Sequence, residues 1–185
     1  MRRQVGPAMR QAGKAALLLM PYDNPPAFKQ AWCIVDLATA AQTSRLTNDA
    51  VYSQGSAKFF MMLPKSEQPW FRETFNDRFD KLLAAVNSID LRTANTPDPD
   101  DKSIILDLCG DVDLLHSSVL FMLRTWLMEQ GNAYILQMEA QKGPDHPKVA
   151  LMLNNMSMLL NDMGREEEAS KYANRALDII EKIGP

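Results

Sequence analysis

The sequence has little of what marks several common protein classes. Its 185 residues include two cysteines, Cys33 and Cys109, without CxxC spacing. This excludes a disulfide scaffold and a cysteine zinc cluster, and it suits a reducing compartment. The longest apolar run, at residues 15–20, is far shorter than the roughly 20 residues of a membrane span. We therefore expect a cytoplasmic protein without membrane contact.

Basic residues and histidines are scarce as well. Lysine and arginine number 20 against 23 acidic residues, so the net charge of −3 offers no basic face for nucleic acid. Positive charge gathers in residues 1–14, which we expect to be a solvated tail. His116 and His146 each stand alone, without carboxylates at metal-ligand spacing. We expect no nucleic-acid partner, no metal and no cofactor, and we expect His146 to order the turn before Pro147.

Two short apolar runs ended by proline, at 15–21 and 59–63, predict buried strands. Helical spacing of apolar residues dominates the rest of the chain. Helices are expected at 27–45, 66–90, 102–109, 111–130, 146–164 and 165–183. The order predicts a predominantly helical α+β protein, in which a small two-stranded α/β half-domain precedes helical hairpins.

The closing segment has the pattern of an antiparallel α-hairpin. Within 146–164 the apolar positions recur in steps of four and three, and Gly164 ends the helix. Small residues on the next helix allow two helices to pack closely. The expected packed stripe of the first helix is Val149, Leu153, Met156, Leu160 and Met163; that of the second is Ala169, Tyr172, Ala173, Ala176, Leu177 and Ile180.

The same segment resembles one tetratricopeptide repeat of the kinesin-light-chain type. The likeness covers residues 139–185 and rests on "GPDHP", "LNNM" and "RAL", with Tyr172 one position before the usual aromatic. We expect a repeat region at 132–185 with one clear repeat at 146–185. Upstream, "LRTWLMEQGNAYILQMEAQKGP" resembles a degenerate earlier unit with a helix, Gly131 and a second helix. The final Gly184-Pro185 resembles the opening of a further repeat.

This resemblance implies an interaction scaffold. In such arrays the first helix of each unit lines a concave groove, so the face opposite the packed stripe becomes the expected binding surface for a partner peptide or helix. Asn154 and Asn155 can both donate and accept hydrogen bonds to an extended backbone. The expected partner-binding residues are Leu151, Asn154, Asn155, Met158 and Asn161. The alternatives are that the asparagines are solvated, or that one contacts a neighbouring hairpin.

Residues 15–95 resemble the second half of a degenerate TIR-like domain, joined to the repeats by a helical connector at 96–131. The likeness rests on a strand, a loop and a helix containing "WCIVDL". It implies a rival function, an NAD-cleaving enzyme in which Asp36 takes the place of a catalytic glutamate. The simpler alternative is that Trp32 and Cys33 pack the helix and Asp36 is a surface acid. A third possibility is a fragment without function alone, and self-association through an open sheet edge or the unfinished array is also expected.

Overall fold

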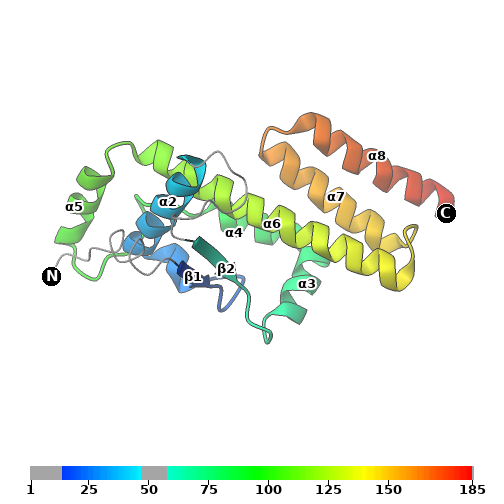
Figure 1. Ribbon diagram of the computed structural model, residues 1–185, viewed down its shortest axis with the longest axis horizontal. Helices are drawn as coiled ribbons and strands as arrows, with labels where there is room; N and C mark the ends of the chain where they lie inside the picture. The colour runs from blue at the N-terminus through cyan, green and yellow to red at the C-terminus, as the bar shows by residue number, and fades with distance from the viewer. Residues whose placement is uncertain (1–13, 47–57, 185) are drawn as a thin grey trace. The chain divides into compact units, whose positions relative to one another are not determined.

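The computed structural model describes residues 14–46 and 58–184 (Figure 1). The described residues form seven α-helices, one short 3-10 helix and a two-stranded parallel sheet. The expected class, predominantly helical α+β, is confirmed. Most of the basic tail expected at 1–14 lies outside the described residues, and its last member, Lys14, is the first residue of a strand.

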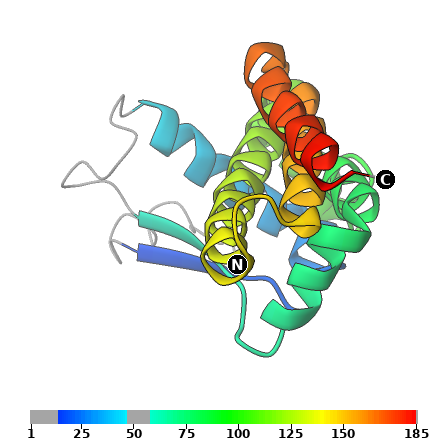
Figure 2. The same ribbon diagram turned by 90° about the vertical axis from the view of Figure 1, so that its right-hand side faces the viewer.

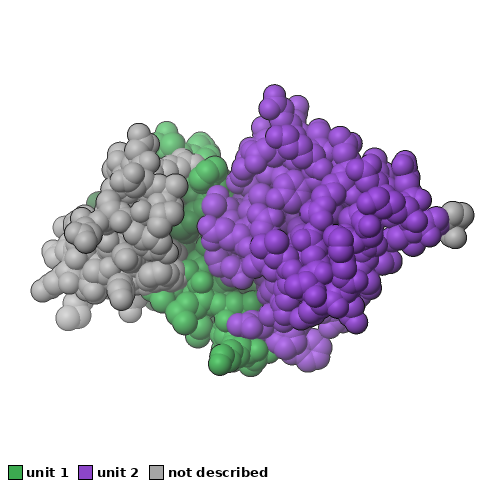
Figure 3. Space-filling view, turned by 45° about the vertical axis from the view of Figure 1, so that its right-hand side comes forward, with its two compact units in different colours: residues 1–67, 87–122 green, residues 68–86, 123–185 purple. Residues whose placement is uncertain are grey.

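The chain divides into two compact units that interleave along the sequence (Figure 3). Unit 1 takes residues 1–67 and 87–122, and unit 2 takes residues 68–86 and 123–185. The helices at 68–86, assigned from sequence to the TIR-like segment, thus belong with the hairpin rather than with the strands. The long helix α6 (Val112–Lys142) contributes its first turns to unit 1 and the remainder to unit 2.

Unit 1 begins with a strand–helix–strand crossover. Strand β1 (Lys14–Leu18) pairs in parallel with β2 (Lys58–Met62), and Ala16 lies opposite Phe60. The 3-10 helix η1 (Pro26–Lys29) and helix α2 (Ala31–Leu46) follow β1. Parallel strands need such a crossover, because a tight turn can join only antiparallel neighbours. On α2 the side chains of Ala31, Ile34, Leu37 and Ala38 are buried, and that of Cys33 is half-buried.

The remainder of unit 1 is held by backbone bonds across distant segments. The Asn95 carbonyl accepts from the Ala31 N–H at 2.9 Å, and the Asn95 N–H donates to the Lys29 carbonyl at 2.7 Å. Helix α5 (Asp100–Cys109) ends at Gly110, whose φ of 63° is a left-handed conformation that glycine adopts without strain. The expected stop of this helix at Gly110 is confirmed.

Unit 2 is built around an aromatic core. The apolar stripe at 66–90 is divided between α3 (Gln68–Asp77) and α4 (Phe79–Asn87), so the single helix expected there is wrong. Its stripe of apolar residues is nevertheless buried throughout. The centroid of the Phe71 ring lies 5.5 Å from that of the Trp126 ring and 6.1 Å from that of the Tyr134 ring, both on α6. Such tilted aromatic pairs add to the stability gained from burial alone.

Gly131 does not interrupt α6, so the two helices expected on either side of it are wrong: one helix runs from Val112 to Lys142. The glycine instead permits a close approach of side chains from two other helices. A Cβ at this position would meet the Met156 sulfur and would lie 2.6 Å from the Phe75 ring. The glycine at this position is explained by this close packing and not by the end of a helix. A glycine inside a helix costs about 1 kcal/mol relative to alanine, which α6 tolerates.

The closing segment is the expected hairpin. Helices α7 (Pro147–Asp162) and α8 (Glu166–Ile183) run antiparallel, beside the second part of α6 (Figures 1 and 2). Gly164, at a φ of 70°, turns the chain between them, and the Arg165 N–H bonds back to the Leu160 carbonyl at 2.9 Å. His146 caps α7 as expected, because its Nδ1 accepts from the Lys148 N–H at 3.1 Å.

The inner face of α8 differs in part from the expected one. Ala169 and Ala176 are buried as expected, and Tyr172 and Ala173 are half-buried. Leu177 and Ile180 are each 56% exposed, while Ile179 takes the inward position. The buried stripe thus advances by seven residues from Ala169 to Ala176 and by three more to Ile179, and the expected assignment of Leu177 and Ile180 to it is wrong.

Candidate functional site

The binding face expected from sequence is present on α7 with one member missing. Leu151, Asn154, Met158 and Asn161 are exposed and follow one another at helical spacing. We call these four residues the α7 face. They combine two apolar side chains with two amide side chains.

Asn155 does not belong to this face. Its side chain is 5% exposed, and its amide nitrogen donates to the Phe75 carbonyl at 2.7 Å and to the Asn76 carbonyl at 3.2 Å. These carbonyls lie at the C-terminal end of α3, where a helix leaves its last carbonyls without partners of its own. The expectation that Asn155 offers its amide to a partner is wrong, because α3 takes that amide. Asn155 instead contacts α3, whereas the alternative stated from sequence was a contact with a neighbouring hairpin.

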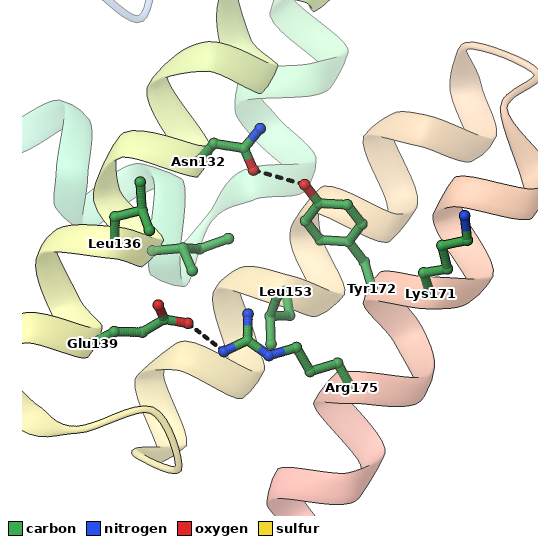
Figure 4. Close-up of a pocket in the computed structure, with 8 residues that line it drawn as sticks. Asn132, Leu136, Glu139, Leu153, Lys171, Tyr172 and Arg175 are labelled. Carbon is green, nitrogen blue, oxygen red and sulfur yellow. Dashed lines mark hydrogen bonds and ion pairs between the residues drawn. The ribbon is translucent and has the colours of Figure 1, made fainter.

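A second surface of unit 2 was not expected from sequence. A hollow of about 370 Å³ lies between α6 and α8 (Figure 4). We call it the α6–α8 hollow. Leu153 of α7, 1% exposed, lies at its base, and Leu136 of α6, 65% exposed, stands at its rim. The lining residues are Asn132, Ile135, Leu136 and Glu139 of α6, Leu153 of α7, and Lys171, Tyr172 and Arg175 of α8.

Two polar bridges join the walls of this hollow. The Tyr172 hydroxyl donates to the Asn132 side-chain oxygen at 2.8 Å, and Arg175 forms an ion pair with Glu139 (Figure 4). Asn132 and Glu139 are seven residues apart on α6, so both face the same side of that helix. The bridges join α6 and α8, and the exposed Leu136 remains accessible beside them.

Charged residues on α8, at the hollow and near it, differ in whether they form ion pairs. Arg175 is paired with Glu139, and Glu168 is paired with Arg165 at 2.6 Å. The hydrogen bond from Arg165 lowers the pKa of Glu168, and Lys171 adds a smaller effect in the same direction. Lys171 forms no ion pair with any residue that the structure describes. It can therefore donate to an acceptor on a ligand without breaking a contact.

The sequence signal for this site was weak. A site on α6 was hidden because the helix was expected to end before Gly131, which separated Asn132, Leu136 and Glu139 from the hairpin. The sequence offered one indication. Lys171 and Arg175 are four residues apart, so both cations lie on the same side of α8, away from Leu177.

Asp36, the alternative catalytic residue, is half-buried on α2 in unit 1. The neighbouring Trp32 is engaged, since its indole N–H donates to an Asp101 carboxylate oxygen at 3.2 Å. The described residues contain no group of three histidines, cysteines or acids able to hold a metal ion. Among the helices described, none combines the length and the apolar character that crossing a bilayer demands.

Comparison of the chain with protein-family models, with curated proteins and with solved structures gives no significant match. A function is therefore inferred from the geometry of the α7 face and the α6–α8 hollow of unit 2.

Proposed function

We propose that unit 2 is a protein-binding module, and that its α6–α8 hollow receives a bulky apolar side chain from a partner peptide or helix. The observation that carries this proposal is an accessible apolar hollow with a polar rim. Its volume of about 370 Å³ lies within the roughly 300–1,000 Å³ common for ligand sites. The resemblance of the hairpin to a tetratricopeptide repeat supports the same class of function.

Apolar contact would supply most of the affinity. Leu136, 65% exposed, offers aliphatic surface to an incoming side chain, and the buried Ile135 and Leu153 form the floor beneath it. Burying a leucine-sized side chain is worth about 1.5–3 kcal/mol. An exposed leucine at the rim of a preformed hollow is a suitable anchor, because little of the protein must reorganise when the partner binds.

Polar groups at the rim would orient the partner. The Asn132 oxygen is taken by Tyr172, while its amide nitrogen donates to no described residue and remains available to a backbone carbonyl. Lys171 can donate to a second acceptor nearby. These donors favour a partner with exposed carbonyl or carboxylate oxygens, without demanding one particular side chain.

We also propose a cytoplasmic location. Neither cysteine forms a disulfide, as is usual in a reducing compartment. The α7 face is the alternative surface for the same function, and the experiment below separates the two.

Peptides selected by phage display on the immobilised full chain would be measured by fluorescence polarisation against three matched variants. Leu136→Glu places a charge in the hollow, Leu151→Glu places one on the α7 face, and Leu177→Glu places one on the outer side of α8. All three leucines are exposed, so each variant should fold, which circular dichroism would verify. We expect Leu136→Glu to weaken binding at least about tenfold and the other two to leave it unchanged.

A selective loss in Leu151→Glu would move the site to the α7 face and contradict the hollow. Equal affinity of all three variants would place the peptide outside unit 2's two candidate surfaces and overturn the proposal.

A further inference from the structure

Unit 1 contains a smaller hollow of about 180 Å³ between α2 and α5, which we call the α2–α5 hollow. Trp32, Val35, Ala38 and Thr39 line it from α2, and Ile105, Leu108 and Cys109 line it from α5. The Thr39 hydroxyl donates to the Val35 carbonyl of its own helix at 2.8 Å. Leu115, in the first turns of α6, completes the lining on the side of unit 1. Three helices thus enclose the space, and none of the lining side chains is charged.

The walls are fixed by burial and by one polar contact. Ala38 and Ile105 are each 1% exposed, so neither helix can approach the other without displacing packed side chains. The Trp32 indole is anchored to α5 by its bond to Asp101. Leu108 is 72% exposed, which places it at the mouth rather than at the base. The space is therefore a persistent gap between packed elements with an opening to solvent.

The chemistry of the lining restricts what could enter. A charged group would lose part of its hydration and meet no counter-ion among the lining residues, which disfavours its entry. Burial raises the pKa of the Cys109 thiol, so the thiol is protonated and neutral near pH 7. In size, the hollow is comparable with an apolar cavity of about 150 Å³ that is known to bind benzene.

We propose that the α2–α5 hollow is a binding site for a small neutral molecule, largely apolar and about the size of one aromatic ring. The site lies in unit 1 and goes beyond the protein-binding function proposed for unit 2. Either proposal can fail without affecting the other.

The direct test is fluorine NMR of 4-fluorotoluene in the presence of the full chain. We expect saturable line broadening, and we expect the charged analogue 4-fluorobenzoate to show none at equal concentration. Broadening that rises linearly without saturation, or equal broadening of both probes, would mean non-specific adsorption and would overturn the proposal.

The location is tested by Cys109→Phe, which fills the hollow, against Cys33→Phe on α2, whose side chain does not line it. Saturable binding should weaken at least about tenfold in Cys109→Phe and persist in Cys33→Phe. Unchanged binding in a folded Cys109→Phe protein would place the ligand elsewhere.

A second readout does not depend on the folding of the filled variants. In a Cys33→Ser protein, Cys109 is the one remaining thiol, and its reaction with methyl methanethiosulfonate can be followed by mass spectrometry. We expect saturating 4-fluorotoluene to slow this reaction at least about threefold, because bound ligand covers the thiol. An unchanged rate would show that 4-fluorotoluene does not occupy the hollow beside Cys109.

Discussion

Replacing Asn155 by alanine tests whether this residue holds α3 against α7 or serves a binding partner. The side chain is 5% exposed and satisfies two backbone carbonyls at the end of α3, at 2.7 Å and 3.2 Å. A hydrogen bond contributes about 1 kcal/mol, and a buried acceptor left without a partner costs about 1–3 kcal/mol. Because the longer bond is only partly buried, we expect Asn155→Ala to lower the free energy of unfolding by about 2–3 kcal/mol.

The matched control is Asn154→Ala, one position earlier on the exposed face. We expect its unfolding free energy to stay within about 0.5 kcal/mol of the wild type, as for most surface substitutions. Urea unfolding followed by circular dichroism at 222 nm measures both variants. For a chain of this length, 1 kcal/mol shifts the melting temperature by about 2–4 °C, so Asn155→Ala should melt roughly 4–12 °C lower.

The isosteric variant Asn155→Asp separates the hydrogen bond from the shape of the side chain. Aspartate keeps the volume, removes both N–H donors and turns a negative charge toward two carbonyl oxygens. We expect it to destabilise the protein at least as much as alanine does. If Asn155→Asp and Asn154→Ala were equally stable, the buried bonds would not support the fold, and the reasoning about Asn155 would be refuted.

Other perturbations have equally definite outcomes. Gly131→Ala should gain about 1 kcal/mol of helix propensity and lose about 1–3 kcal/mol to overpacking, so urea unfolding should show a net loss of about 1 kcal/mol; a stabilised variant would contradict the close approach at that position. Tyr172→Phe should cost about 0.5–1.5 kcal/mol in the same assay by removing the bond to Asn132, and a neutral result would show that this bridge does not hold the walls of the hollow. The lowered pKa of Glu168 means that its pairing with Arg165 stabilises the fold above the unfolded-state pKa and is lost as the pH falls through the folded-state pKa. Glu168→Gln should therefore flatten the acid limb of the stability curve slightly, while an unchanged curve would show that water screens the pair completely.

The predictions from sequence were most accurate for features that are set by residues close together in the chain, such as the end of a helix. Gly164 separates two helices because the left-handed turn favours glycine, and the steps of four and three around Leu153 place one stripe inward. Both features are local, so no knowledge of distant residues was needed. Gly131 shows the opposite case, since the same residue type serves a contact with Phe75, which lies far away in the chain.

The binding surfaces of unit 2 were predicted less well, for a related reason. Periodicity gives the side of a helix on which a residue lies, but it does not say which sides have neighbours. Asn155 lies next to Asn154 in sequence and about 100° away around the helix, which is enough to turn it from solvent toward α3. Leu177 and Ile180 fit a helical stripe as well as Ile179 does, and only the position of α7 decides among them.

The α6–α8 hollow depends on contacts between residues that are far apart in the sequence. It exists because α6 continues past Gly131 and thereby brings Leu136 and Glu139 alongside α8, more than thirty residues later in the chain. Its walls are joined by pairs such as Arg175 with Glu139, each of which contributes little to stability at a surface.

If those bridges set the width of the hollow, the partner's affinity should depend on them more than the protein's stability does. Exchanging the charges in an Arg175→Glu and Glu139→Arg double variant should then restore binding that either single variant weakens, with unfolding free energies that differ by less than about 1 kcal/mol throughout. Loss of binding in the double variant, measured by fluorescence polarisation with the same selected peptide, would instead mean that Arg175 or Glu139 contacts the partner directly.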